Sequence, residues 1–462
     1  MQPGARRVVT PDEGIFARLH PGRVEAHPRT GSGTKNHHNR RMIPRDLLRT
    51  CFHTALAAVE PSAAVRAAVR RDGEWLHCGS WRYRLAGRVI VIGAGKASAP
   101  MAAAIEELVA DRIPDGCIVV KYGHTVPLKH LRVYEAGHPI PDAAGEIGAQ
   151  AIESAVRGLN PQDLVIVCLS GGASSLLAAP RPPVTLIDKQ VITALLLASG
   201  ADIHAVNTVR KHLSRLKGGG LARACAPATV LTLAISDVPD DDLAIIGSGP
   251  TTPDYSTPAD ALAIVIKCLP AEQIPPAVIT ALSRTDITTP HDFSHVHQRI
   301  IASNRIALNA VERSRLQEKI EIGNPLTGQA HLAAEEFCRR AAALPPGSLL
   351  VAGGETTVSL GDHPGHGGRN QEFALAAARW IMAHDAPLTV LAAGTDGNDG
   401  PTDAAGGLVD GTTWERALAA GLDPHRALAD HDAYRLLQSI GDLVVTGPTN
   451  TNVMDLAFAY RT

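Results

Sequence analysis

The chain has 462 residues, with 44 Lys or Arg against 46 Asp or Glu and a formal net charge of −2. This length exceeds one ordinary hydrophobic core and predicts two domains, whereas the near-zero charge argues against nucleic acid or an anionic membrane surface as a partner. The seven cysteines are scattered and never in CxxC spacing, which indicates a reducing, cytoplasmic location, and the apolar runs are far shorter than the roughly 20 residues of a membrane-spanning helix.

Residues 1–41 differ from the rest of the chain. They mix Arg, His, Pro, Gly and Ser without an apolar period, and we predict a disordered extension. They contain no apolar run of the kind that a secretory signal requires, and their acidic residues fit a transit peptide poorly. A helical pattern begins directly after Met42, so Met42 is an alternative start of translation.

From Arg88 onward, apolar strands alternate with Ala-rich helical segments, which predicts an α/β fold built on a parallel sheet with helices on both faces. The predicted strands span residues 88–92, 117–121, 131–135, 164–169, 230–235, 298–302, 349–352, 388–392 and 442–446. The predicted helices span residues 99–110, 143–158, 183–199 and 371–384. Ligand-binding loops then fall after the carboxyl ends of the strands.

The chain turns polar over residues 283–297, and we place the domain boundary there. The predicted first domain covers residues 42–285 and the predicted second domain covers residues 286–462.

The first glycine-rich loop follows the strand at 88–92. Gly93 and Gly95 can bring the backbone close to a phosphate at a helix N-terminus, and Lys96 adds a positive charge. A P-loop needs four residues between its first glycine and the Gly-Lys pair, but Ala94 alone separates these glycines. A dinucleotide fold needs an acid at the end of the second strand, which here ends at Lys121, and this weakens NAD binding. A purely structural turn is the other reading of this loop.

A second loop follows the strand at 164–169. Its glycines and hydroxyls, Ser170, Gly171, Gly172 and Ser174, could form an oxyanion or phosphate site. The order is not the GxSxG of a serine nucleophile elbow, so a hydrolase is not favoured. A small-residue turn that lets a strand and a helix pack closely is the alternative.

A basic segment precedes a triple glycine. Arg210 and Lys217 share one face at helical spacing and could hold a carboxylate or phosphate, although such a strip is also typical of solvated surface. The candidate binding residues of this region are Asn207, Arg210, Lys211, Lys217, Gly218, Gly219 and Gly249. Asp237 follows the strand at 230–235 and is a candidate metal ligand or base.

Two turns in the second half add candidates. Glu355 and Thr356 follow the strand at 349–352, and Arg369 and Asn370 open a helix. At that position Arg369 can face an anion together with the helix N-terminus. An ion pair with Glu372 is the alternative for Arg369.

Residues 394–403 form an acidic, glycine-rich loop after another apolar strand. Its three glycines permit positive φ angles, and Asp396, Asp399 and Asp403 supply hard oxygen ligands for a cation such as Mg²⁺. An EF-hand is excluded, because Gly400 stands where that loop needs Asp or Asn. The alternative is a turn whose carboxylates bond their own backbone.

In this order, the segments resemble the type II glycerate 2-kinase family, whose C-terminal half is called the MOFRL domain. The match runs from about Arg45 to Asp455 and also includes the motifs at residues 137–142 and 447–452. The resemblance implies two α/β domains, the first a Rossmann-like, mostly parallel sheet, with the active site in the cleft between them. It also implies transfer of the γ-phosphoryl group of ATP to the 2-hydroxyl of D-glycerate, with Mg²⁺. Members are often labelled hydroxypyruvate reductases, and an NAD(P)H-dependent reductase is the alternative.

Within that resemblance, we expect Lys96 and Arg369 to contact the transferring phosphoryl group. Mg²⁺ would be held by Asp237, Asp396 and Asp399, and Asp237 is one candidate for the proton acceptor. The loops at 170–174 and 217–220 would bind phosphate or the glycerate carboxylate. The expected partners are D-glycerate and ATP; the oligomeric state is left open, with a homodimer as one option.

Overall fold

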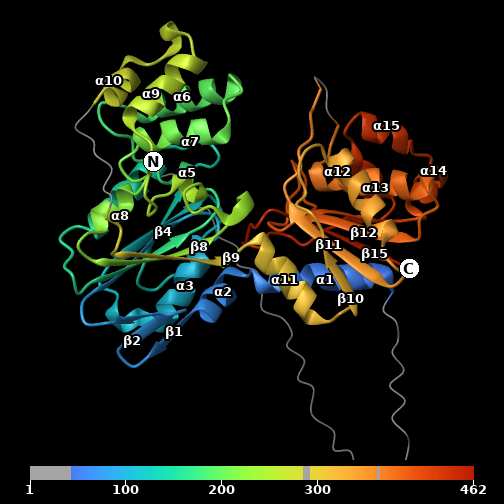
Figure 1. The fold of residues 1–462 in the computed structure, drawn as a ribbon, viewed down its shortest axis with the longest axis horizontal. Helices are drawn as coiled ribbons and strands as arrows, with labels where there is room; N and C mark the ends of the chain where they lie inside the picture. The colour runs from blue at the N-terminus through green and yellow to red at the C-terminus, as the bar shows by residue number, and fades with distance from the viewer. Residues whose placement is uncertain (1–42, 285–291, 362–364) are drawn as a thin grey trace, which may run out of the picture. The chain divides into compact units, whose positions relative to one another are not determined.

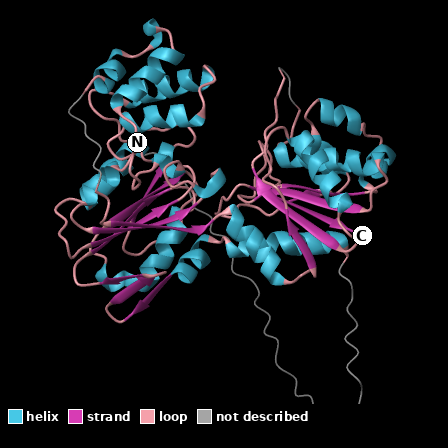
Figure 2. Cartoon of the chain, viewed as in Figure 1, coloured by secondary structure: helices cyan, strands magenta, loops and turns pink. Residues whose placement is uncertain are grey.

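The computed structural model describes residues 43–284, 292–361 and 365–462 (Figure 1). The predicted extension over residues 1–41, together with Met42, lies outside the described residues. The described chain forms two six-stranded sheets and a three-stranded sheet, and helices flank the strands of each large sheet (Figure 2). None of the helices within these ranges is long and apolar enough to cross a membrane.

The first large sheet is parallel throughout, as predicted. Its strand order is β6-β5-β4-β7-β8-β9. The strands are β4 (Val89–Ala94), β5 (Gly116–Lys121), β6 (Arg132–Ala136), β7 (Leu164–Leu169), β8 (Thr229–Ile235) and β9 (Val296–Ala302). The central strands β4 and β7 are buried at every residue, as expected when helices cover both faces of a parallel sheet.

Alternate residues of β4 enter two different cores. Val89 and Val91 pack with helices on one face, and Ile90 and Ile92 pack with helices on the other. The first face is covered by α2 (Pro61–Ala68) and α3 (Ser98–Val109), the second by α4 (Ala143–Ala155), α5 (Ala173–Leu176) and α8 (Gly220–Cys225). A meander that we did not predict, β1 (Val69–Asp72), β2 (Trp75–Cys78) and β3 (Trp81–Arg84), forms the small antiparallel sheet.

Four helices form a separate layer with its own apolar core. They are α6 (Leu186–Ala198) and α7 (Ile203–His212) from the β7–β8 connection, and α9 (Pro258–Cys268) and α10 (Pro276–Leu282) from the β8–β9 connection. Figure 1 shows these helices grouped together. Short 3₁₀ turns complete this half of the chain at η1 (Ala110–Arg112), η2 (Pro239–Asp241), η3 (Ile246–Ser248) and η4 (Ala271–Gln273).

The second large sheet is mixed, with the order β10-β11-β15-β12-β13-β14. Its strands are β10 (Lys319–Ile322), β11 (Ser348–Gly354), β12 (Leu388–Gly394), β13 (Gly406–Asp410), β14 (Leu443–Val444) and β15 (Asp455–Arg461). The pair β10–β11 is parallel, whereas the other pairs are antiparallel. Our expectation of a parallel sheet is therefore wrong for this half, because the last strand of the chain inserts antiparallel between β11 and β12.

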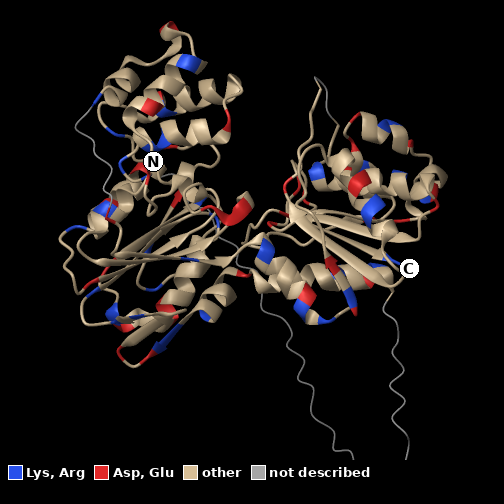
Figure 3. Ribbon diagram, viewed as in Figure 1, with Lys and Arg blue, Asp and Glu red and all other residues tan. Residues whose placement is uncertain are grey.

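Helices cover both faces of the second sheet. On one face lie α1 (Pro44–Ala58) and α11 (Asn304–Ser314), and on the other α12 (Ala330–Ala343) and α13 (Arg369–Ala383). Helices α14 (Thr413–Ala419), α15 (Pro424–Ala429) and α16 (Ala433–Ser439) pack around α13. Acidic and basic residues are interspersed along the ribbon, in keeping with the balanced composition (Figure 3).

The sheets do not divide at the predicted boundary between residues 285 and 286. Strand β9 lies beyond that boundary but pairs with β8 and completes the first sheet. Helix α1 lies before it but packs on the second sheet, where Phe52 meets Phe458 with ring centroids 6.4 Å apart. The polar composition of residues 283–297 therefore did not mark the division between the two large sheets.

Candidate active site

The loops that follow β4 and β7 pack tightly against each other. A Cβ at Gly93 would lie 2.3 Å from the carbonyl oxygen of Cys168, and one at Gly95 would lie 2.1 Å from Ser170 Oγ. The Lys96 amide donates a hydrogen bond to the Gly171 carbonyl (2.9 Å). The two glycines therefore permit close packing of the loops, and this packing places Lys96 at the carboxyl end of the sheet.

Ser170 is part of this packing. Its side chain is buried, and its Oγ accepts a hydrogen bond from the Ala97 amide (3.0 Å) and lies 3.3 Å from Ser98 Oγ. The hydroxyl thus holds the first turn of α3. Its contacts support the structural alternative for this serine rather than the predicted ligand contact.

Asp237, at the end of β8, lies against the same loop. A Cβ at Gly171 would approach Asp237 Oδ2 to 2.2 Å, so glycine at this position leaves room for the carboxylate. Burial raises the pKa of Asp237 to about 6, while the nearby Lys96 ammonium opposes the shift and Glu355 reinforces it. A half-buried carboxylate and an ammonium group therefore face each other across the strand ends.

The second sheet contributes the other charges. Lys96 Nζ lies 3.8 Å from Asp396 Oδ2, and Arg369 pairs with Glu355 (2.9 Å) and with Asp455 (2.5 Å). Burial raises the pKa of Glu355, and Asp455 and Asp396 add to this effect while Arg369 and Lys96 oppose it. Two cations and four carboxylates, including Asp237, therefore form one electrostatic cluster.

The acidic loop at 394–403 divides its aspartates between two roles. Asp396 points toward Lys96, whereas Asp399 is buried and accepts hydrogen bonds from the amides of Asn370 (3.1 Å) and Gln371 (2.8 Å). Asp399 also accepts from the Asn370 side chain (3.2 Å). Its carboxylate satisfies the free N–H groups that begin α13, so Asp399 caps this helix and the Asn370 side chain is hydrogen-bonded to the cap.

The described residues contain no group of three or more His, Cys, Asp or Glu side chains arranged to hold a metal ion. Asp237 and Asp396 remain as carboxylates that face Lys96. Mg²⁺ commonly binds one or two protein carboxylates and takes its other ligands from substrate phosphates and water. Of the three aspartates predicted as Mg²⁺ ligands, Asp399 is engaged with the start of α13, whereas Asp237 and Asp396 lie near Lys96.

The triple glycine does not present free amides. The Gly218 amide donates to the Ser248 carbonyl (3.1 Å) and the Gly219 amide donates to the Gly249 carbonyl (2.8 Å). Lys211 pairs with Asp254 (3.5 Å). These predicted contact residues are engaged in local structure and lie outside the charge cluster.

The Ser248 hydroxyl contacts the side chains of both Asn207 and Ser174. Ser248 Oγ lies 2.9 Å from Ser174 Oγ and donates to Asn207 Oδ1 (3.3 Å). Arg210 and Lys217 line a cavity of about 400 Å³ that also includes Ser174. Thr356 is buried and lines another cavity, of about 450 Å³, beside Glu355 and Arg369.

Two histidines beside Lys96 escaped the sequence analysis. The His138 ring packs against Gly172, where an added Cβ would lie 2.9 Å from the ring. Gly172 also has a φ of +87°, a conformation that favours glycine. Burial, reinforced by Lys96 and Lys121, lowers the pKa of His138 to about 4, so the imidazole is neutral at physiological pH. Burial also lowers the pKa of His124, whose Nδ1 has no hydrogen-bond partner among the described residues. The motif at 137–142 was a signal for His138, but residue spacing assigned it no role.

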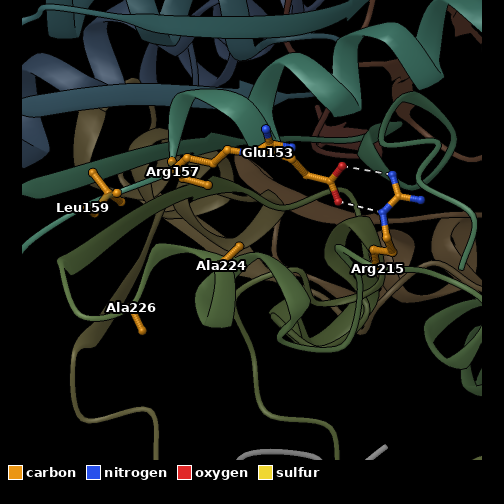
Figure 4. A pocket seen from close by; sticks show the side chains of 8 residues that line it. Glu153, Arg157, Leu159, Arg215, Ala224 and Ala226 are labelled. Carbon is orange, nitrogen blue, oxygen red and sulfur yellow. Dashed lines mark hydrogen bonds and ion pairs between the residues drawn. The ribbon is translucent and has the colours of Figure 1, made fainter.

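A further cavity, of about 500 Å³, lies at the opposite end of the first sheet (Figure 4). It is lined by residues just before β7 and β8, such as Leu159 and Ala226, and holds Arg215 paired to Glu153 through two contacts (2.8 and 2.9 Å). Open α/β sheets bind ligands beyond the carboxyl ends of the strands. This cavity is therefore not the candidate site.

Comparison with known proteins places this geometry in context. The model described as "Domain of unknown function (DUF4147)" matches residues 47–283, and the MOFRL family model matches residues 348–455. A glycerate 2-kinase of Pyrococcus horikoshii is 40% identical over 423 residues, which cover 88% of this chain and 95% of that protein. A protein of Agrobacterium vitis, provisionally named a hydroxypyruvate reductase, is 42% identical over 423 residues, which cover 89% of this chain and 93% of that protein.

Solved structures agree with these matches. A crystal structure of a glycerate kinase from Thermotoga maritima superposes with a TM-score of 0.80 and 36% identity, covering 90% of this chain and 99% of that one. A crystal structure of a Pyrococcus horikoshii protein gives a TM-score of 0.80 and 39% identity, and the match covers 91% of this chain and 99% of that one.

Proposed function

This chain belongs to the glycerate kinase family, and we propose that it transfers the γ-phosphoryl group of ATP to the 2-hydroxyl of D-glycerate to give 2-phospho-D-glycerate. The observation that carries the proposal is the ion pair between Lys96, beside the first sheet, and Asp396, beside the second. Arg369 and its partner Glu355, also beside the second sheet, belong to the same charge cluster. Phosphoryl transfer depends mainly on positioning and on neutralising charge at the transferring group.

Lys96 and Arg369 are the two cations of this cluster. In the reaction, the bond between the γ-phosphorus and the β–γ bridging oxygen breaks, and a bond from the glycerate 2-oxygen to phosphorus forms. We assign Lys96 and Arg369 to the negative charge that spreads over the equatorial oxygens. The pairing of Arg369 with Asp455 and Glu355 fixes the guanidinium before substrates arrive.

Asp396 would hold Mg²⁺, whose chemistry when bound is to neutralise phosphate oxygens. We also assign Asp237 Oδ2 as the acceptor of the hydroxyl proton. A carboxylate whose pKa burial has raised is a better proton acceptor than an exposed one.

The reductase alternative gains no support from the first sheet. Strand β5 ends at Lys121, so the position that dinucleotide folds use to bind the ribose carries a base instead of an acid. Two assays separate the functions: ADP release with D-glycerate and Mg²⁺, and nicotinamide oxidation with hydroxypyruvate. We expect ADP release alone, with phosphorus NMR showing phosphate on the 2-oxygen; nicotinamide oxidation without ADP release would refute the proposal.

Replacing Lys96 tests the central assignment. Lys96→Ala should lower kcat by about 10³-fold, since one preorganised charge at the transition state contributes on this scale. Its melting temperature should stay near that of the wild type, because its ion pair is long at 3.8 Å. Lys319→Ala, an exposed lysine of β10, is the matched control and should keep full activity. Unchanged turnover in Lys96→Ala would remove the basis for this mechanism.

A further inference from the structure

A second concentration of positive charge lies apart from the catalytic cluster. Lys189 of α6, Arg210 of α7 and Lys217 line the cavity of about 400 Å³ that includes Ser174. No Asp or Glu of the described chain lines this cavity. A cavity with several cations and no acid predicts an anionic ligand.

Two of these cations are unpaired. Lys189 is 7% exposed, and neither it nor Arg210 has a hydrogen bond or an ion pair to any residue that the structure describes. Lys217 differs, because its Nζ donates to the carbonyls of Ser174 (2.6 Å) and Leu177 (3.5 Å) at the base of the cavity. A buried, unpaired cation is costly to a folded protein, so Lys189 is a poor candidate for a purely structural role.

The rest of the wall is largely apolar. It includes Ile140 and Leu197, which are 69% and 55% exposed although they border the cavity. An apolar surface next to Lys189 and Arg210 suits a ligand with a flat, uncharged end and a charged tail.

The cavity and the catalytic cluster share one loop. Ser174 lies in the cavity wall, Gly172 lies against His138, and Gly171 lies against Asp237. The segment from Gly171 to Ser174 therefore borders both the cavity and the Asp237 carboxylate.

We propose that this cavity binds the donor nucleotide, with Lys189 and Arg210 on the polyphosphate and Ile140 and Leu197 against the base; this inference rests on the proposed kinase function. A three-carbon acid with one charge would leave most of the apolar wall empty and one cation unpaired. The polyphosphate tail carries several negative charges and the purine supplies an apolar face, so a nucleotide matches both parts of the wall.

The test measures binding without turnover. ADP and adenosine are titrated by calorimetry, without glycerate, into wild type, Lys189→Met and Arg210→Met. Each variant should weaken ADP binding about 10- to 100-fold, the range for losing one charge-assisted hydrogen bond. Adenosine, which has no phosphate, should bind all three proteins alike. Unchanged ADP affinity, or an equal loss for adenosine, would overturn the proposal.

Stability gives a second readout. Lys189→Met removes a buried, unpaired charge, so its melting temperature should match or exceed that of the wild type. Lys189→Arg keeps the charge and should retain ADP affinity, and Lys267→Ala on α9 is the exposed control. A lower melting temperature in Lys189→Met together with weak ADP binding in Lys189→Arg would make Lys189 a structural residue.

The outcomes separate this inference from the proposed function. If the wild type does not phosphorylate glycerate but the variants bind ADP more weakly, the cavity assignment stands and glycerate is refuted as the substrate. If the protein phosphorylates glycerate but the variants keep their ADP affinity, the proposed function stands and the cavity assignment is refuted. A rise confined to the KM for glycerate would assign the cavity to the acceptor carboxylate and overturn the nucleotide assignment.

Discussion

Residues of one type in one loop acquire different chemistry from their contacts. Asp396 and Asp399 are three positions apart in the acidic loop, and the sequence predicted both as metal ligands. Asp396 lies 3.8 Å from Lys96, whereas Asp399 accepts hydrogen bonds from two backbone amides of α13. The amides that Asp399 meets are almost 30 residues away, so local composition could not distinguish the two.

The pH dependence of nucleotide binding follows from Lys189. Burial lowers the pKa of Lys189 to about 8, and the nearby Arg210 and Arg215 add to this effect while Glu146 opposes it. Lys217 is a further cation close to Lys189. Since the cavity needs the protonated amine, ADP affinity should be full below pH 8 and should fall by up to about tenfold per pH unit above it.

Lys189→Arg provides the comparison, because a guanidinium stays charged across this range. Calorimetric ADP titrations from pH 7 to pH 9.5 should show a fall in the wild type and a flatter profile in the variant. Superimposable profiles would show that Lys189 does not set the pH dependence.

At the scale of elements, most predicted strands and helices form close to where the periodicity placed them. Strand β7 spans the predicted residues 164–169, and α3 and α13 differ from prediction by one or two residues at each end. Strand β14 keeps two residues of the five predicted, because it pairs with β13 at Gly406 and Gly407 alone. The short meander β1–β3 was missed because its strands are four residues long and half exposed.

The start of α13 depends on a residue outside the helix, and this gives a prediction for Asp399. Asp399→Ala would leave the buried amides of Asn370 and Gln371 without acceptors, and it should lower the free energy of unfolding by about 1–3 kcal/mol. Urea unfolding measures the loss, with Asp403→Ala as an exposed control from the same loop. An unchanged free energy of unfolding combined with a raised Mg²⁺ requirement would restore Asp399 as a metal ligand.

At the scale of the molecule, one of the apolar cores of the described chain links the two large sheets. Residues 42–462 form one compact unit, and a single apolar cluster contains Phe52 of α1, Val91 of β4 and Phe458 of β15. The helix nearest the N-terminus is thereby tied to the strand nearest the C-terminus. We propose that the two predicted domains depend on each other for stability and that their boundary lies after β9 rather than at 285.

This core predicts cooperative unfolding. Phe52→Ala should lower the free energy of unfolding by about 3–5 kcal/mol, the usual cost of truncating a buried phenylalanine. The urea transition should shift as a whole whether it is followed by tryptophan fluorescence or by circular dichroism. Leu418→Ala, at a residue 55% exposed, should have little effect. Two separate transitions, of which Phe52→Ala moves one, would contradict a shared core.

The sequence by itself determined the strands of the parallel sheet, the loops after their carboxyl ends and the family resemblance that implies a glycerate kinase. These properties depend on short-range periodicity and on ordered motifs, which the linear chain carries in full. Only the tertiary structure decided that Asp399 caps a helix, that Asp455 joins the charge cluster, and that Lys189 faces an acid-free cavity. Those contacts depend on strand order and on burial, because the charge and pKa of a side chain are set by neighbours that are distant along the chain.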